Sequence, residues 1–264
     1  MKKAIQKLLN GIGYEIRKKP AETVIQKSVK TEDLTLYNTA TGNYYLPTHA
    51  YQDVVSNAIK YNQVFEKEVV ELACKYIKKD TAVLDVGSNF GQMSILFSQQ
   101  VGDNGKVYAF DADDFIYKIL VKNIEANNKT GKIIPTFGAV HNKENETLFF
   151  PVQDFERFGT YGSYGIDYNS KQGRALQSIT IDSLNIAEPV SFMKIDIQGG
   201  DLQAMQGAVK TIEKNKMPIL FEYEYHFEDE YNLNFQEYVD FVKEIGYVFK
   251  KVVNGHNYLI VPKE

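Results

Sequence analysis

The sequence predicts an α/β fold with a mostly parallel sheet, and three observations support this prediction. Short apolar runs alternate with helical patterns over most of the 264 residues, which is typical of a parallel sheet with helices on both faces. A glycine-containing turn joins one of the first strands to its helix, as in folds that bind nucleotides at a helix N-terminus. Near the end of the chain, Asn254 and Gly255 separate two apolar runs and predict an antiparallel hairpin.

The expected elements begin with an irregular or strand-like stretch over residues 21–51. A helix is expected over residues 62–79, where apolar side chains recur at helical spacing. Beyond residue 80, short apolar runs predict strands and amphipathic runs between them predict helices. The expected strands are residues 82–86, 107–110, 133–137, 192–195, 219–223, 247–253 and 257–261, and the expected helices are residues 91–100, 114–127, 201–214 and 235–245.

Residues 1–50 are expected to be an N-terminal extension of one domain over residues 51–264, since the chain is long enough to bury a large single core. The first 19 residues are basic and carry a short apolar face, which predicts an amphipathic helix. Such a helix either touches a membrane or partner or packs on the domain as an ordinary surface helix.

The composition is that of a soluble globular protein, with 44% hydrophobic and 24% charged residues. The net charge of −4 argues against a nucleic-acid partner that needs phosphate neutralisation. A single cysteine, Cys74, excludes an intrachain disulfide and a cysteine zinc cluster. No apolar run reaches the length of a membrane span and no signal peptide is evident, so a cytoplasmic location is expected. The sequence leaves the oligomeric state open, with a homodimer among the options.

The turn after the strand at residues 82–86 predicts the ligand class. Gly87 and Gly91 allow a tight turn and a close approach of the ligand, and Asp111 follows Gly91 by 20 residues at the end of the next strand. A carboxylate at that spacing grips ribose hydroxyls in dinucleotide-binding folds. Asn89, however, stands where those folds need a glycine beside a pyrophosphate. A ligand with a ribose but no diphosphate fits better, and S-adenosylmethionine (SAM) is such a ligand.

A long insertion over residues 151–177 interrupts the alternation of strands and helices. It is rich in glycine and tyrosine and includes Tyr161, Tyr164 and Arg174. Insertions of this length inside a compact domain are usually functional or disordered. One interpretation is a lid whose tyrosines and arginine contact a polar, even anionic, substrate. The other is a solvent-exposed β-meander with scattered tyrosines.

Several motifs together resemble the FkbM-type methyltransferases, a branch of the SAM-dependent class I enzymes. The resemblance covers roughly residues 50–225. It rests on Val83-Leu-Asp-Val-Gly-Ser-Asn-Phe-Gly91, Val107-Tyr-Ala-Phe-Asp111, Asn123-Ile-Glu-Ala-Asn127, Ile179-Thr-Ile-Asp-Ser-Leu184, Met193-Lys-Ile-Asp-Ile-Gln-Gly-Gly-Asp201 and Pro218-Ile-Leu-Phe-Glu222, with Phe65-Glu66 upstream.

The resemblance implies a Rossmann-like class I fold, with a seven-stranded sheet that ends in a reversed hairpin. It also implies a SAM-dependent O-methyltransferase acting on a hydroxyl of a sugar or glycan precursor, such as a nucleotide sugar or a surface polysaccharide. A secondary metabolite or another small molecule, methylated on oxygen or nitrogen, is the alternative acceptor. Four positions depart from the family pattern: Asp111 and Ala112 stand where the family usually has Glu-Pro, and Gln198 and Asp201 stand where it usually has glutamates.

The expected cofactor residues lie at the carboxyl ends of the strands, where such sheets bind ligands. Asp85 and the turn residues Gly87, Ser88, Asn89 and Gly91 are assigned to the methionine end of SAM, and Glu66 to its ammonium group. Asp111 and Ala112 are assigned to the ribose, and Asn142 to the adenine. For Asp85 and Asp111 the alternative is a helix cap or a surface acid.

The expected catalytic residues are Asp196 and His226, since a hydroxyl acceptor must lose a proton during transfer. Glu222, Glu224 and His226 alternate along an expected strand and so share one face. With Asp196 they form a candidate site for a divalent cation, and the alternative is a solvated strand end.

Two other function classes compete with methyl transfer. A nicotinamide-dependent oxidoreductase on a similar fold needs a glycine at position 89 and a Tyr-x-x-x-Lys base. Position 89 is asparagine, and in the helix expected over residues 114–127 the residue four after Tyr117 is Val121, not lysine. A catalytically inactive binding module is disfavoured because Asp85, Gly87, Gly91 and Asp111 are all intact.

Overall fold

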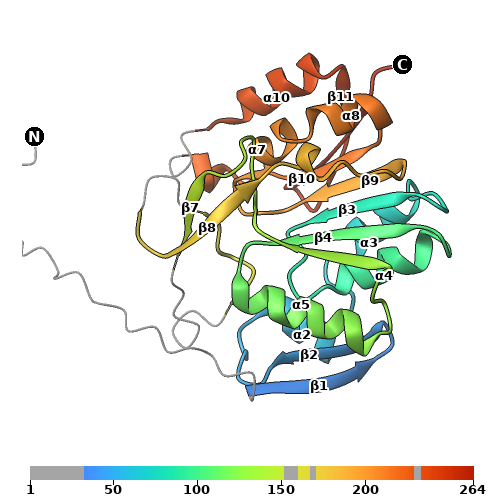
Figure 1. Cartoon of the computed structure of the whole chain (residues 1–264), viewed down its shortest axis with the longest axis vertical. Coiled ribbons are helices and arrows are strands. Elements are labelled where there is room, and N and C mark those ends of the chain that lie inside the picture. The colour runs from blue at the N-terminus through green and yellow to red at the C-terminus, as the bar shows by residue number, and fades with distance from the viewer. Residues whose placement is uncertain (1–32, 152–159, 167–170, 229–232) are drawn as a thin grey trace, which may run out of the picture.

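The structure is a computed structural model that describes residues 33–151, 160–166, 171–228 and 233–264. The predicted basic helix within the first 19 residues lies outside these ranges. So does much of the predicted lid, residues 152–159 and 167–170. Figure 1 shows the described part as a central sheet with helices on either side of it.

The central sheet has seven strands in the order β11-β12-β10-β9-β3-β4-β5 (Figure 1). β3 lies between β4 and β9 and is parallel to both, whereas β12 is antiparallel to β10 and β11. The strands that follow β3 are added toward one edge of the sheet, and from β9 onward they are added toward the other edge. This reversal creates a crevice at the carboxyl ends of β3 and β9. The strands are β3 Ala82–Val86, β4 Lys106–Asp111, β5 Ile133–Phe137, β9 Val190–Ile195, β10 Ile219–Glu222, β11 Tyr247–Val253 and β12 Asn257–Pro262.

Each face of the sheet carries its own apolar core. Alternate residues of β3 point to opposite faces, so Val83 belongs to one core cluster and Leu84 to the other. The first cluster includes side chains of α2 Val54–Lys60, α3 Lys67–Cys74, α4 Gln92–Gln100 and α5 Asp114–Ala126. The second includes side chains of α7 Asp201–Gln206, α8 Val209–Asn215 and α10 Phe235–Glu244. Because both faces are covered, the ends of the strands are the part of the sheet left for a ligand.

An N-terminal hairpin packs against α5 at the bottom of Figure 1. Its strands are β1 Leu34–Thr39 and β2 Gly42–Pro47. The backbone N–H of Tyr45 donates to Asn123 Oδ1 at 2.6 Å, and Tyr44 is fully buried in the first core cluster. The hairpin therefore shares the first core cluster with residues beyond position 50.

Two expected helices differ from the structure. The helix expected over residues 62–79 is confined to α3, because Asn62 and Glu66 adopt left-handed backbone conformations, with φ of 58° and 46°. The helix expected over residues 201–214 is divided into α7 and α8 at Gly207. A Cβ at Gly207 would lie 2.0 Å from the carbonyl oxygen of His141, so the neighbouring loop packs directly on the helix backbone there.

A small second sheet borders the predicted lid. Its strand order is β6-β8-β7, with β6 Ala139–Val140, β7 Thr147–Phe150 and β8 Arg174–Ile179. β7 and β8 are antiparallel, so the described ends of the insertion emerge from neighbouring strands. Short 3-10 helices, η2 Asp182–Leu184 and η3 Tyr225–Phe227, occur in two of the remaining connections.

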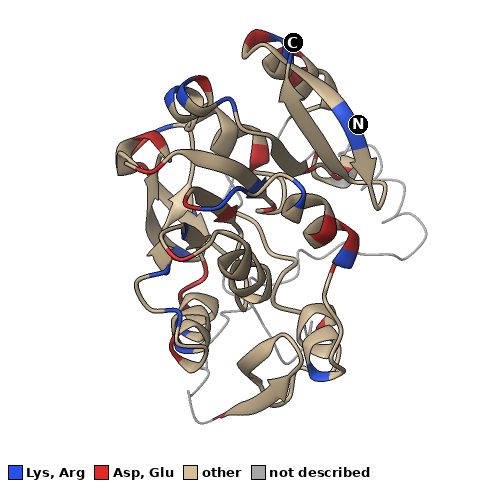
Figure 2. Cartoon of the chain, turned by 90° about the vertical axis from the view of Figure 1, so that its right-hand side faces the viewer, with Lys and Arg blue, Asp and Glu red and all other residues tan. Residues whose placement is uncertain are grey.

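Among the described helices, none combines the length and the apolar character needed to cross a membrane. Lysine and arginine positions are interspersed with acidic ones along the described ribbon (Figure 2).

Candidate active site

A cavity of about 290 Å³ opens at the carboxyl ends of β3, β4, β9 and β10. It brings together most of the residues predicted to form the site, although they come from segments far apart in the sequence. Those that line it are Glu66, Gly87, Ser88, Asn89, Asp111, Ala112, Tyr161, Tyr164, Asp196, Glu222 and Glu224. The predicted residues Asp85, Gly91, Asn142 and Arg174 do not line it.

The turn after β3 is bound to the ends of the strands on either side of it. The backbone N–H groups of Gly87 and Ser88 both donate to the carbonyl oxygen of Phe110, at 3.0 and 2.9 Å. Gly87 has a φ of 84°, and a Cβ there would lie 1.8 Å from the carbonyl oxygen of Asp196. Glycine is required at this position for two reasons: the left-handed backbone and the contact with β9. Asn89 adopts the left-handed conformation as well, with a φ of 49°.

Asp111 ends β4 with its carboxylate at the cavity. Oδ2 accepts the backbone N–H of Asn89 at 3.0 Å, and Oδ1 accepts that of Asp113 at 2.9 Å. Burial raises the pKa of Asp111 to about 7, against the lowering effect of these N–H donors. The carboxylate is thus held in a fixed orientation beside the turn, as a carboxylate that binds a ribose requires.

Asp85 and Gly91 support the turn from behind, which corrects their predicted direct contact with the cofactor. Asp85 is fully buried and accepts a short hydrogen bond from Ser94, and its Oδ1 lies 4.0 Å from Lys194 Nζ. Burial raises the pKa of Asp85, whereas Lys194 and Ser94 oppose this shift. Gly91 begins α4 as its N-cap, and a Cβ there would lie 2.7 Å from Leu120.

Asn142 and Arg174 also have other partners. The amide of Asn142 donates to Gln206 on α7 at 2.8 Å, and Gly138, Ala139 and Val140 line the cavity instead. Arg174 forms ion pairs with Asp113, at 3.1 Å, and with Asp114. Its guanidinium group therefore braces the start of α5 against β8, and its assignment to the substrate set stays a prediction.

Lys194 on β9 lies among the predicted acids, although sequence reasoning missed it. Its ammonium group is 3.1 Å from Asp196 Oδ2 and 3.1 Å from the carbonyl oxygen of Gly87. Burial would lower the pKa of Lys194, but the carboxylates of Asp196 and Asp85 outweigh it and raise this pKa above its usual value. Burial would likewise raise the pKa of Asp196, but Lys194 holds it below its usual value. The two groups therefore form a buried ion pair in the cavity wall.

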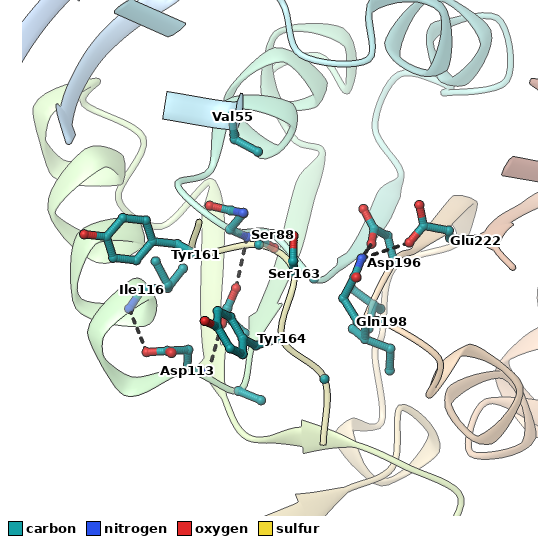
Figure 3. Close-up of a pocket in the computed structure, with 18 of the residues that line it drawn as sticks. Val55, Ser88, Asp113, Ile116, Tyr161, Ser163, Tyr164, Asp196, Gln198 and Glu222 are labelled. Carbon is teal, nitrogen blue, oxygen red and sulfur yellow. Dashed lines mark hydrogen bonds between the residues drawn. The ribbon is translucent and has the colours of Figure 1, made fainter. Parts of the chain in front are cut away.

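Glu222 lies next to Asp196 at the end of β10 (Figure 3). Burial and the neighbouring Asp196 carboxylate raise the pKa of Glu222 to about 11. Glu222 is therefore a neutral carboxylic acid at physiological pH, while Asp196 is ionised.

The predicted metal set is not arranged as expected. β10 ends at Glu222, so Glu224 and His226 do not continue its alternation; His226 lies in η3, and its side chain is not among those described. The structure instead brings Glu66, Glu222 and His256 together, with three potential ligand atoms within 4.8 Å of one another. His256 Nε2 lies 3.5 Å from Glu66 Oε1 and 3.6 Å from Glu222 Oε1, so polar contacts among the side chains also account for this cluster.

The segment from Thr160 to Ile166 forms the opposite wall (Figure 3). The buried carboxylate of Asp53 holds this segment: Oδ1 caps α2 through the N–H of Ser56, and Oδ2 accepts the N–H of Tyr161 at 2.8 Å. The Tyr161 ring contacts the rings of Phe90 and Phe115, with centroid distances of 5.9 and 5.8 Å. This part of the predicted lid is packed against the domain.

The family model for the methyltransferase FkbM domain matches residues 85–249 of the sequence. The chain belongs to this family. The match begins at Asp85 beneath the glycine turn and includes β4, β9 and β10, which supply Asp111, Asp196 and Glu222. The strand order and the reversed β12 are those of the class I, Rossmann-like methyltransferase fold, as predicted. No curated protein matches the sequence.

Solved structures similar to this chain include three methyltransferases. A methyltransferase FkbM from Methylobacillus flagellatus KT is 15% identical, with a TM-score of 0.47, and the match covers 70% of this chain but only 44% of that one. Fibrillarin from Aeropyrum pernix, solved with bound SAM, is 12% identical, covers 89% and 85% of the two chains, and has a TM-score of 0.41. Precorrin-6y C5,15-methyltransferase from Geobacter metallireducens is 12% identical, covers 75% and 88%, and has a TM-score of 0.43. The family assignment rests on the family model.

Three residues of the FkbM domain site were missed from the sequence. A signal for Lys194 existed: it is a lone charge inside an apolar strand, two residues before Asp196. Asp53 precedes an apolar run as a helix N-cap does, but nothing in the sequence links it to Tyr161. His256 follows the hairpin turn, and only the tertiary structure brings it to Glu66.

Proposed function

We propose that this FkbM domain transfers a methyl group from SAM to a hydroxyl group of a sugar or glycan precursor. The observation that carries the proposal is the position of Asp111, whose carboxylate lines the cavity beside the turn at Gly87–Asn89. A carboxylate at the end of the second strand suits a ribose, and a turn with Asn89 in place of glycine suits a ligand without a pyrophosphate. The residues present fit SAM on both counts.

Each part of the cofactor has residues that fit it. Asp111 would accept hydrogen bonds from the ribose hydroxyls, with Ala112 beside it. The backbone of Gly87, Ser88 and Asn89 would hold the methionine end. Glu66 lines the same cavity, and its carboxylate is a suitable partner for an ammonium group.

Asp196 would accept the proton that the acceptor hydroxyl loses. When bound, SAM supplies an electrophilic methyl group, so much of the catalysis lies in positioning the acceptor. Lys194 keeps the Asp196 carboxylate ionised and fixes its orientation from within β9. Glu222 would not serve as the base, because it is protonated and hydrogen-bonded to Asp196. His226 remains a second candidate for the base.

The charge of the cavity wall favours an acceptor without phosphate groups. Glu66, Glu224 and Asp196 line the cavity. Asp113 lies in the same wall but is already paired with Arg174. An anionic nucleotide sugar would meet these acids, whereas a neutral polyhydroxyl compound would find hydrogen-bond acceptors. Tyr161 and Tyr164 also line the cavity and offer aromatic surface to a sugar ring (Figure 3). A small secondary metabolite of similar character is the alternative acceptor.

Calorimetric titration with SAM, S-adenosylhomocysteine (SAH) and NADH tests the cofactor. We expect micromolar affinity for SAM and SAH and no binding of NADH; the reverse would refute the proposal. Asp111→Asn should weaken SAH binding by at least about 10-fold, because one amide cannot accept both N–H donors and the ribose. Asp182→Asn is the matched control, since Asp182 also accepts two backbone N–H groups, from Lys210 and Thr211, and does not line the cavity.

Mass spectrometry of a panel of acceptors tests the substrate class. The panel pairs neutral oligosaccharides with nucleotide sugars and with phenolic and amine metabolites, each incubated with SAM. We expect a mass gain of one methyl group on the neutral sugars. Methylation of only the phenolic or amine compounds would overturn the sugar assignment and leave the cofactor assignment intact.

A divalent cation was predicted at Asp196, Glu222 and Glu224, whereas the structure groups Glu66, Glu222 and His256 as potential ligands. A separate experiment tests whether transfer needs a cation. If a metal assists transfer, EDTA should abolish methylation and added Mg²⁺ or Mn²⁺ should restore it. Full activity in EDTA would show that methyl transfer needs no cation at these three side chains.

A further inference from the structure

Gln198 connects the ends of two strands through a single amide group. Its Nε2 donates to Asp196 Oδ1 at 3.1 Å and to Glu222 Oε2 at 2.9 Å, so both N–H bonds of one nitrogen are directed at carboxyl groups (Figure 3). Asp196 directly follows β9, and Glu222 is the last residue of β10. The amide therefore lies against the ionised Asp196 and the protonated Glu222, which are also hydrogen-bonded to each other.

The backbone around Gln198 is arranged to present this amide. Gln198 has a φ of 56°, which is the left-handed region that residues other than glycine rarely occupy. The buried Asp201 secures the loop from the other side: Oδ2 accepts the N–H of Ile197 at 3.4 Å, and Oδ1 accepts the N–H of Glu222 at 3.1 Å. A left-handed residue at a ligand cavity is a conformation that persists because the surroundings hold it in place.

Of the two acids that Gln198 joins, Asp196 carries a negative charge and Glu222 is neutral. Asp196 shares Lys194 with Asp85, so one ammonium group faces two carboxylates. Glu66 and Glu224 line the cavity near them. SAM and SAH differ by one methyl group and by the positive charge of the sulfonium. A negative wall near the sulfur atom would therefore stabilise bound SAM more than bound SAH.

We propose that Gln198 is a positioning residue that fixes the Asp196 carboxylate beside Glu222 in the cavity wall, where the charge of Asp196 favours the cationic methyl donor over its neutral thioether product. The inference rests on the proposed function, since it requires SAM in this cavity. It adds a role to a residue that makes no covalent contribution: a preference for SAM over SAH promotes release of the spent cofactor after each transfer.

The test compares SAM and SAH affinities by calorimetry at one pH in the wild-type chain and in Gln198→Met, which keeps the side-chain length and removes both N–H donors. We expect the wild-type chain to bind SAM more tightly than SAH. In Gln198→Met the ratio of the two affinities should fall by roughly five- to tenfold, because Asp196 is no longer fixed on the cavity side. Gln177→Met is the matched control: Gln177 is exposed on β8 and does not line the cavity, so the ratio should be unchanged.

A double-mutant cycle shows whether Gln198 acts through Asp196. Asp196→Asn alone should reduce the ratio, and adding Gln198→Met should reduce it little further. Additive effects would overturn the inference, as would a wild-type ratio in Gln198→Met or no preference for SAM in the wild-type chain. If Gln198→Met does not fold, Gln198→Ala and Asp196→Asn decide the question by the same ratio. Failure of the wild-type chain to bind either ligand would instead refute the proposed function.

Discussion

Gly87→Ala tests the two reasons for a glycine in the turn after β3, its left-handed backbone and its close contact with Asp196. Gly87 has a φ of 84°, and a left-handed backbone costs an alanine roughly 1–2 kcal/mol. The added Cβ would also lie 1.8 Å from the carbonyl oxygen and 2.8 Å from the carbonyl carbon of Asp196. These are backbone atoms of the central sheet, so overpacking adds about 1–3 kcal/mol. The free energy of unfolding should therefore fall by about 2–5 kcal/mol.

Gly131→Ala is the control for backbone conformation alone. Gly131 has a φ of 79°, and a Cβ there meets no atom within 4 Å, so only the conformational term of roughly 1–2 kcal/mol applies. Urea unfolding of both variants, followed by calorimetric titration with SAH, measures the difference. We expect Gly87→Ala to lose more stability than Gly131→Ala and at least about 10-fold in SAH affinity, while Gly131→Ala binds normally. Equal stability losses and unchanged SAH affinity in both variants would refute the contact between the turn and β9.

Two further predictions concern the cavity wall formed by residues 160–166 and the pH dependence of stability. Asp53→Ala and Asn234→Ala each remove a helix N-cap, so each should lower the free energy of unfolding by about 1 kcal/mol. Only Asp53→Ala should also weaken SAH binding and expose the chain at Tyr161 to proteolysis, because Asp53 accepts the Tyr161 N–H. Equal SAH affinities in the two variants would contradict this role of Asp53. Burial raises the pKa of Asp111 and Asp201 from 3.8 to about 7, so between about pH 4 and 7 the folded chain holds protons that the unfolded chain has released. Stability should therefore fall as pH rises through this window; a melting temperature higher at pH 8 than at pH 5.5 would contradict this assignment.

The regular part of the fold could be predicted because it depends on local patterns. The strands of the central sheet are short apolar runs bounded by turns, and their positions match the expected ranges to within a few residues. The reversed hairpin was likewise expected from Asn254 and Gly255. Helices were less well predicted, because contacts from distant segments interrupt them, as at Gly207.

The sequence also predicted that acidic side chains meet at the strand ends of the candidate site. Asp111, Asp196 and Glu222 follow buried strands, and parallel strands bring their carboxyl ends to one edge of the sheet. Asp85 was misplaced, because its position at the penultimate residue of β3 directs its side chain under the turn rather than toward the cavity. The ion pairs of Arg174 were not predicted, because its acidic partners Asp113 and Asp114 lie at least 60 residues earlier in the chain.

The sequence by itself determined the α/β architecture, the glycine turn and the acids at the strand ends, since each depends on residues close together in the chain. Only the tertiary structure decided which of those acids carry charge. Lys194 on β9 ionises Asp196, Asp196 and burial keep Glu222 protonated, and Gln198 holds the two together. Electrostatic interactions depend on distance and burial, which arise only when strands from separate parts of the chain meet in one sheet.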